Sequence, residues 1–223
     1  MKMIVDESFA QAAAQVAALV ERKPNAVIGL TEVDMPETFF SALRGCNVSF
    51  RGVTFFNACE LAGEAGEGSR SQAAKLQTLL YDALQPAEVL TPAVEDYDAQ
   101  IRAHGGMDLV ILGLGERGHI AYNEPGADFG APTHESKLAD VTRKALAESF
   151  GGLDAVPTHG VTMGISTILG ARQIMLLAFG EEKANAAQKT LEGRPETFIP
   201  ASFLQLHTDV NLYLDSAAAS KMA

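Results

Sequence analysis

The chain has 223 residues, of which 47% are hydrophobic and 20% are charged, as in ordinary soluble globular proteins. This length suits one α/β domain with a substantial core, so we expect a single domain over residues 1–223. The formal net charge of −11 disfavours nucleic acid and acidic membranes as partners, and no apolar run approaches the roughly 20 residues that span a bilayer. The N-terminus lacks a secretory signal pattern and the two cysteines give no disulfide framework, so we expect a cytoplasmic location.

Strand and helix patterns alternate from the N-terminus onward. The first half predicts a helix over residues 8–22, a buried strand over 26–30, a helix over 35–44 and a second strand over 53–57. Residues 63–68 (GEAGEG) are glycine-rich and acidic, which predicts a mobile loop or lid. Then follow a helix capped by Ser71 that reaches about residue 84, a helix over 95–104 and a strand over 107–112.

The second half continues the same alternation. It predicts a loop over 126–133, helices over 142–150 and 165–169, a strand over 173–179, a helix from Gly180 to about 192, a last strand over 209–214 and a frayed tail over 216–223. Alternating strands and helices predict βαβ units, and therefore a three-layer α/β/α sandwich with a mostly parallel central sheet.

The most informative segment is residues 109–125, LVILGLGERGHIAYNEP. An apolar run opens into a turn containing Gly115 and Gly118, and His119 and Glu124 follow directly. This order is typical of a parallel strand that ends at the active edge of an α/β sheet. Glycines in such a turn let the backbone pass close to a ligand, so Gly115 and Gly118 are candidate substrate-binding positions. The imidazole and the carboxylate can form a base and its orienting group.

This segment resembles the signature of the glucosamine-6-phosphate deaminase and galactosamine-6-phosphate isomerase family, Gly-x-Gly-x-Asp/Asn-Gly-His-x-x-x-Asn-Glu-Pro. The resemblance extends over nearly the whole chain, including AVIGL at 26–30, PTHGVTMG at 157–164 and IPASFLQLH at 199–207. The ending Asn-Glu-Pro fits this branch better than the related phosphogluconolactonases. The resemblance implies a sugar-phosphate isomerase-like fold and conversion of an amino-hexose 6-phosphate to a ketohexose 6-phosphate plus ammonia.

The resemblance also implies roles for individual residues. His119 corresponds to the histidine that moves the ring-opening proton, and Glu124 to the glutamate that orients it. Lys183 corresponds to the phosphate-binding lysine, because it lies at the start of the helix that follows the strand over 173–179. The alternatives are a buried histidine that caps a turn and a solvated helix lysine.

Two positions depart from the family's catalytic pattern. Arg117 stands where the family has Asp or Asn in the histidine relay, and a permanent cation beside His119 would lower the pKa of the imidazole and could not accept its N–H. Arg117 could instead pair with Glu116 or Glu124, or bind an anion. Cys59 stands at the family's base aspartate, where an ordinary thiol is mostly protonated at neutral pH. It is either a base with a depressed pKa or a small residue that fills the position.

The phosphate loop departs as well. The family's glycine-rich loop is replaced by Thr31-Glu-Val-Asp-Met-Pro36, and Glu32 and Asp34 would bring negative charge towards a phosphate. Thr31 alone could donate a hydrogen bond to it, and Asp34 could be the N-cap of the next helix.

Three functions therefore stay open. The first is the family's isomerase or deaminase reaction on a sugar phosphate, without a cofactor. The second is an enzyme for an unphosphorylated substrate, whose hydroxyls or ammonium Glu32 and Asp34 would hold, and the third is sugar-phosphate or partner binding without turnover. A phosphogluconolactonase-type hydrolase is less favoured. The five histidines show no zinc-type pairing, so no metal site is expected, and a homo-oligomer is compatible with the sequence.

Overall fold

The computed structural model describes residues 1–63, 68–93 and 95–222. Most of the loop or lid expected at 63–68 lies outside these residues. A seven-stranded sheet has the order β1-β10-β9-β6-β2-β3-β5, and every neighbouring pair is parallel. Its strands are β1 (Lys2–Val5), β2 (Val27–Leu30), β3 (Thr54–Asn57), β5 (Glu88–Leu90), β6 (Leu109–Gly113), β9 (Ile174–Ala178) and β10 (Val210–Leu214).

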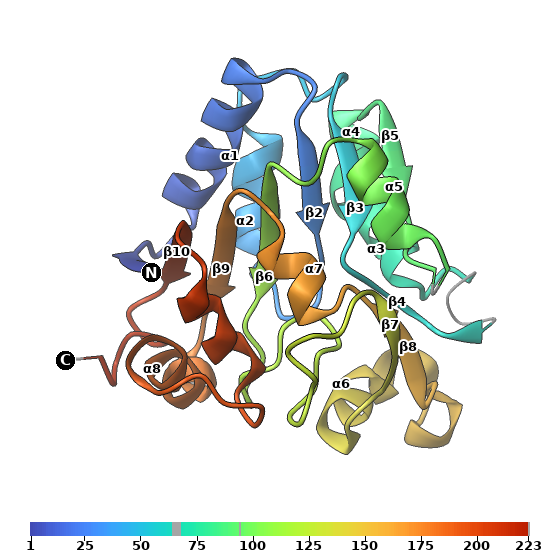
Figure 1. The fold of residues 1–223 in the computed structure, drawn as a ribbon, viewed down its shortest axis with the longest axis vertical. Helices are drawn as coiled ribbons and strands as arrows, with labels where there is room; N and C mark the ends of the chain where they lie inside the picture. The colour runs from blue at the N-terminus through green and yellow to red at the C-terminus, as the bar shows by residue number, and fades with distance from the viewer. Residues whose placement is uncertain (64–67, 94, 223) are drawn as a thin grey trace.

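Two helical layers cover this sheet (Figure 1). One apolar cluster joins the strands to α1 (Ala10–Arg22), α2 (Glu37–Arg44) and a continuous helical segment made of α3 (Gln72–Leu76), a π-helical turn (Gln77–Tyr81) and α4 (Asp82–Leu84). A second cluster joins the opposite face to α5 (Tyr97–Ala103), α7 (Ile165–Leu169) and α8 (Ala184–Glu192). The prediction of a three-layer sandwich with a mainly parallel sheet is confirmed.

The central strands are buried on both faces, which explains their continuous apolar sequences. All five residues of β6 are buried, as are all five of β9. A parallel sheet with helices on both faces requires this, because neither face of a strand meets water. All carboxyl ends of a parallel sheet meet at one edge, so the loops after β2 and β6 become neighbours there.

A second, smaller sheet was not predicted. The strands β4 (Cys59–Leu61), β7 (His134–Lys137) and β8 (His159–Thr162) form an antiparallel sheet in the order β4-β8-β7. It lies with α6 (Asp140–Phe150) beyond the carboxyl ends of the central strands, in the lower right of Figure 1. Short strands from three distant segments pair only in the folded chain, so local patterns do not reveal them.

The structure adds an unpredicted strand at one end of the chain and corrects an expectation at the other. Residues 2–5 form the edge strand β1, paired with β10. The segment after β10 is not a frayed tail up to residue 222: the side chain of Ala218 is fully buried, its N–H donates to the Asp215 carboxylate at 2.7 Å, and the N–H of Ser216 donates to Glu7 at 3.0 Å. No helix of the described residues is long and apolar enough to cross a membrane.

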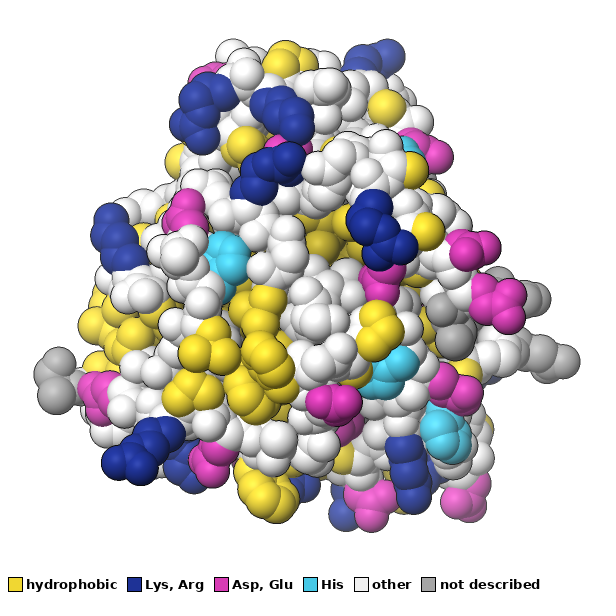
Figure 2. Space-filling view, in the orientation of Figure 1, with side chains coloured by type: hydrophobic (Ala, Val, Ile, Leu, Met, Phe, Trp, Pro, Cys, Tyr) yellow, Lys and Arg dark blue, Asp and Glu magenta, His cyan; other side chains and the backbone are white. Residues whose placement is uncertain are grey.

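The surface shown in Figure 2 carries dispersed acidic and basic side chains, with apolar side chains gathered in its lower half. Among the exposed large apolar residues are Phe198 and Leu206. The remaining helical turns of the described chain are Leu153–Ala155, Glu181–Lys183 and Pro200–Leu206.

Candidate active site

The loops that follow β2 and β6 pack directly against each other at the carboxyl edge. A Cβ built on Gly113, the last residue of β6, would lie 2.4 Å from the carbonyl oxygens of Val33 and Asp34. Any larger residue at 113 would therefore push the β2–α2 loop away. The close approach brings the side chains of that loop over the turn that carries His119.

The His119 ring is held against the backbone of its own turn. It is buried, with 6% of its surface exposed, and the Gly115 N–H donates to the His119 carbonyl at 2.9 Å. A Cβ on Gly115 would lie 2.0–2.3 Å from three ring atoms. Gly118 has φ +77° and packs on Ile199, whose side chain would be 2.7 Å from a Cβ there. Both glycines thus position His119 by letting the ring and the turn pack without a side chain between them.

Asp34 joins His119 to Lys183. One carboxylate oxygen of Asp34 lies 2.7 Å from His119 Nε2, and the other accepts a hydrogen bond from Lys183 Nζ. Asp34 adopts φ +55°, the left-handed conformation that aspartate and asparagine tolerate better than most residues. The expectation that Asp34 caps α2 is wrong, because the N-cap residue is Pro36.

The Asp34 carboxylate is stabilised in its charged form. Burial alone would raise the pKa of Asp34, but the hydrogen bond and charge of His119, together with Lys183, hold that pKa below its usual value. Lys183 is itself only 4% exposed. The protein therefore supplies its own anion to this buried lysine.

Glu124 lies on the other side of the imidazole. Its Oε2 is 4.0 Å from His119 Nδ1. We expect these two groups to share a hydrogen bond, either directly or through one water, and this distance is too long for the direct form. Glu124 Oε1 accepts from the Thr142 hydroxyl at 2.6 Å and the Ala139 N–H at 3.1 Å. His119 Nδ1 and Glu124 Oε2 are both buried and find no hydrogen-bond partner among the described residues.

Cys59 does not reach the candidate site. Its side chain is 1% exposed, and its Sγ lies 3.3 Å from the Thr31 hydroxyl. Burial raises the pKa of the Cys59 thiol far above its ordinary value, and the nearby Glu32 and Glu60 carboxylates add to this. Cys59 does not border the pocket. Of the two alternatives for this position the structure favours the small residue that fills it, because a buried neutral thiol does not supply a base.

Native-state labelling can test this placement. In iodoacetamide at pH 8, we expect the folded protein to take at most one label, at the half-buried Cys46, and a second only after urea unfolding. Burial and the raised thiol pKa both protect Cys59. Intact mass and peptide mapping would score the labels, with Cys46→Ser as the control that should take none when folded. Rapid labelling of native Cys59 would contradict this account.

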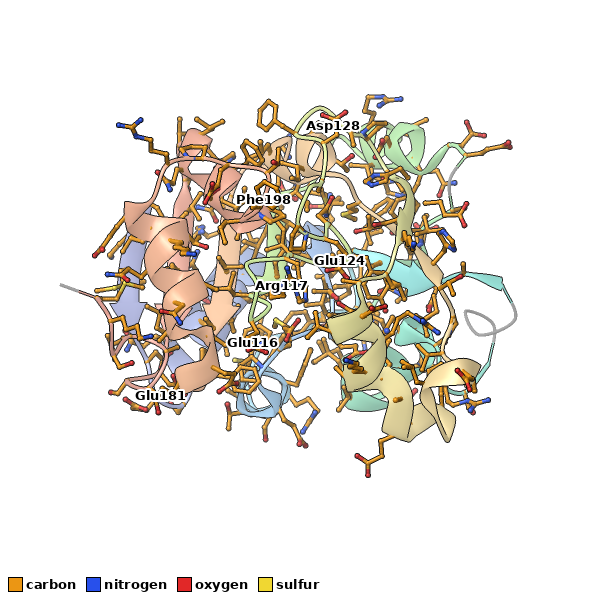
Figure 3. All side chains as sticks on the ribbon, turned by 90° about the horizontal axis from the view of Figure 1, so that it is seen from below. Glu116, Arg117, Glu124, Asp128, Glu181 and Phe198 are labelled. Carbon is orange, nitrogen blue, oxygen red and sulfur yellow. The ribbon has the colours of Figure 1, made fainter. Side chains whose placement is uncertain are left out.

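Thr31 and Arg117 also differ from their expected positions. The Thr31 hydroxyl accepts from the Val33 N–H at 3.0 Å and faces Cys59, and only 1% of the residue is exposed, so it does not point towards a ligand. The side chain of Arg117 is exposed and lines a separate hollow with Lys189 and Phe198. Figure 3, viewed towards the carboxyl edge, labels Glu116, Arg117 and Glu124, which all lie on the segment that follows β6.

Glu32 and Lys75, which the sequence did not assign a catalytic role, line the same pocket as Asp34. Glu32 Oε1 is 3.1 Å from Lys75 Nζ, and their side chains are 16% and 29% exposed. Lys75 comes from α3, whose start is held by Glu60: its carboxylate accepts from the N–H groups of Leu61, Gln72 and Ala73 at 2.7–2.9 Å. Helical spacing alone could show that Lys75 lies near the start of α3, but not which loop it faces.

These groups border one pocket of about 250 Å³. It carries four carboxylates, two lysines and one imidazole, and apolar residues of α6 form its far wall. The lining residues are Glu32, Val33, Asp34, Lys75, Glu116, His119, Tyr122, Val141, Thr142, Ala145, Leu146, Glu182 and Lys183. Both lysines contact loop carboxylates, so a ligand anion must compete with Glu32 and Asp34 for them.

Three further basic residues on and beside α6, Lys137, Arg143 and Lys144, do not line this pocket. Arg143 donates to the carbonyl oxygens of Leu153 and Val156 at 3.0 and 3.1 Å, and so holds the end of α6. Lys137 and Lys144 are exposed.

Comparison with known proteins finds similarity over the whole chain. A family model described as glucosamine-6-phosphate isomerases/6-phosphogluconolactonase matches residues 2–213. A glucosamine-6-phosphate deaminase of Shewanella loihica is 37% identical, with 100% of this chain and 90% of that protein aligned. Glucosamine-6-phosphate deaminase 1 of Bacillus subtilis is 36% identical, over 96% of this chain and 95% of that protein.

Solved structures show the same fold. The structure of a monomeric glucosamine-6-phosphate deaminase superposes with a TM-score of 0.87 at 34% identity, over 99% of both chains. A 6-phosphogluconolactonase of Thermotoga maritima gives a TM-score of 0.75 at 17% identity, over 96% of this chain and 98% of that one, which is a likeness of fold alone.

Proposed function

We propose that this chain, which belongs to the glucosamine-6-phosphate isomerase/6-phosphogluconolactonase family, converts an amino-hexose 6-phosphate to a ketohexose 6-phosphate and ammonia. Glucosamine 6-phosphate and galactosamine 6-phosphate are the candidate substrates. The relatives named as glucosamine-6-phosphate deaminases support the first of these, and the resemblance of the signature supports both.

The observation that carries the proposal is the meeting of His119 and Lys183 in one pocket at the carboxyl edge. The reaction needs a group that moves a proton to the ring oxygen and a cation that holds the phosphate. A buried imidazole is suited to the first task, and a buried lysine to the second. Both side chains contact Asp34, so they lie within reach of a single small ligand.

Neighbouring groups support His119 in this role. The Asp34 carboxylate fixes one ring nitrogen as a donor and orients the ring. Glu124, 4.0 Å from the other nitrogen, places a second carboxylate beside the ring. Gly115 and Gly118 position the imidazole and are not proposed to bind substrate themselves, and Arg117 and Cys59 have no catalytic part in this proposal.

A substrate panel tests the proposal. The purified protein would be incubated with glucosamine 6-phosphate, galactosamine 6-phosphate and the corresponding free amino sugars, and ammonia and ketose would be measured together. We expect equimolar ammonia and ketose phosphate from one of the phosphates, and at least a hundredfold lower rate for His119→Asn. Absence of both products from all four sugars would overturn the proposed enzyme activity and favour binding without turnover.

The contact between Asp34 and Lys183 favours a second candidate, an unphosphorylated amino sugar. A carboxylate already neutralises the lysine, and three further acidic groups border the pocket. Such a pocket suits hydroxyls and an ammonium better than a phosphate dianion. Turnover of a free amino sugar in preference to its phosphate would establish this alternative.

A further inference from the structure

We propose that Glu32 is the base that carries the proton between C2 and C1 of the sugar. This inference rests on the proposed isomerase or deaminase function. It gives the reaction a carboxylate that the buried Cys59 cannot provide.

Glu32 is the carboxylate of this pocket whose surroundings suit proton transfer. Asp34 is committed to His119 and Lys183, and Glu116 and Glu182 are exposed at the rim. Glu124 binds Thr142 and the backbone. Glu32 borders the pocket and is largely buried, and its Oε1 contacts Lys75.

Glu32 also lies near Cys59, the residue that stands at the position of the family's base aspartate. Thr31, the preceding residue, contacts Cys59 through its hydroxyl at 3.3 Å, yet neither Thr31 nor Cys59 borders the pocket. Glu32, the next residue, does border the pocket, and it is separated from Cys59 by Thr31 alone in this chain of contacts.

The charges around Glu32 keep it a usable base. Burial raises the pKa of the Glu32 carboxyl above its usual value, the Lys75 ammonium opposes this and the Asp34 charge adds to it. The buried Cys59, Glu60 and Tyr122 groups also face it. A carboxylate with a raised pKa abstracts a carbon-bound proton more readily than an exposed one, provided it stays ionised near neutral pH.

The step is an internal proton transfer that needs no oxidant or reductant. Glu32 takes the C2 proton of the open-chain amino aldose; the C–H electron pair forms the C1–C2 double bond, and the O1 carbonyl pair becomes an alkoxide that takes a proton from water. Glu32 then returns its proton to C1, while the nitrogen lone pair forms the C2–N double bond of an iminium cation. Water adds to C2 and gives a proton back to the solvent; the C2–N bond then breaks, ammonia leaves, and the added oxygen becomes the ketose carbonyl.

Hydrogen exchange tests the base separately from ring opening. The protein would be incubated in deuterium oxide with glucosamine 6-phosphate, galactosamine 6-phosphate, glucosamine or galactosamine, and deuterium at sugar carbon would be followed by NMR. We expect Glu32→Gln to lose at least a hundredfold in exchange and product formation, while it binds the sugar at least as tightly as the unmodified protein, because the change frees Lys75 from its carboxylate partner. Glu37→Gln, an exposed change on the same segment, is the matched control and should behave as the unmodified protein.

A second variant tests the pH dependence of the rate, which a purely structural role of Glu32 would not change. In Lys75→Met the cation that lowers the Glu32 pKa is lost, so the acid limb of the rate profile should move to higher pH. If Glu32→Gln does not fold, this shift still decides the proposal. If the unmodified protein exchanges hydrogen and Glu32→Gln exchanges it equally well, the role of Glu32 is overturned but the proposed function is not. An acid limb that stays at the same pH in Lys75→Met would have the same meaning. If the unmodified protein exchanges hydrogen with none of the four sugars, both this role and the proposed function are overturned.

Discussion

Replacing Asp34 with asparagine should tighten the binding of glucosamine 6-phosphate by at least about tenfold, or about 1.4 kcal/mol. The change removes the protein's own anion from Lys183 and from His119. Two like charges 4 Å apart repel by about 4 kcal/mol at the effective dielectric of a protein surface, so a phosphate dianion next to Asp34 is strongly disfavoured. Asparagine keeps the size of the side chain and tolerates the φ of +55° at this position. Isothermal titration calorimetry would measure the change.

Asp154→Asn is the matched control, since it makes the same change in net charge at an exposed residue away from the pocket. It should alter the affinity less than twofold. Unphosphorylated glucosamine should bind Asp34→Asn, Asp154→Asn and the unmodified protein with more similar affinities. Micromolar affinity of the unmodified protein for the phosphate, unchanged in Asp34→Asn, would show that Asp34 does not compete with the ligand.

This competition should persist over the physiological pH range. The folded-state pKa of Asp34 is held below its ordinary value. The ion pair therefore contributes its full stability above the unfolded-state pKa of about 3.9, and that contribution is lost as the pH falls through the lower folded-state value. Between pH 6 and 8 the carboxylate stays ionised, so the affinity gain of Asp34→Asn should be present at both limits.

The fold could be predicted from the sequence because its main signals are local. The apolar runs of β2, β6 and β9 and the helical patterns between them each identify an element without reference to the rest of the chain. The three strands of the small sheet lack this property. They are three or four residues long and are stabilised by pairing with partners far along the chain.

The candidate site could be predicted only in part. His119 and Lys183 stand within recognisable segments, and the structure brings both to one pocket. The sequence also shows that the phosphate loop is altered, but not where its carboxylates point. Whether Asp34 caps a helix or reaches Lys183, 149 residues away, depends on how closely two loops pack. The burial of Cys59 behind Thr31 is equally a property of three-dimensional packing.

That packing depends on Gly113, so Gly113→Ala should be among the most damaging single-methyl changes in the chain. The added Cβ would lie 2.4 Å from the Val33 and Asp34 carbonyl oxygens, far inside van der Waals contact, and both are backbone atoms that cannot rotate away. Overpacking of this kind costs about 1–3 kcal/mol. Urea unfolding should show a loss of that size, and product formation should fall because Asp34 and Glu32 move with the loop.

Gly130→Ala provides the matched comparison. A Cβ at Gly130 would meet only the Asp128 side chain, at the ordinary contact distance of 3.7 Å, so this variant should be within about 0.5 kcal/mol of the unmodified protein, as for most surface substitutions. Equal stability of Gly113→Ala and Gly130→Ala would mean that the β2–α2 loop does not rest on the end of β6.

Asp34 reaches His119 and Lys183 only because the loop and β6 pack so closely. A loop that could move away from β6 at no cost would therefore also leave Lys183 free to bind a phosphate. Calorimetry on Gly113→Ala with glucosamine 6-phosphate distinguishes the two cases: distortion of the packed site weakens binding, whereas release of Asp34 from Lys183 strengthens it.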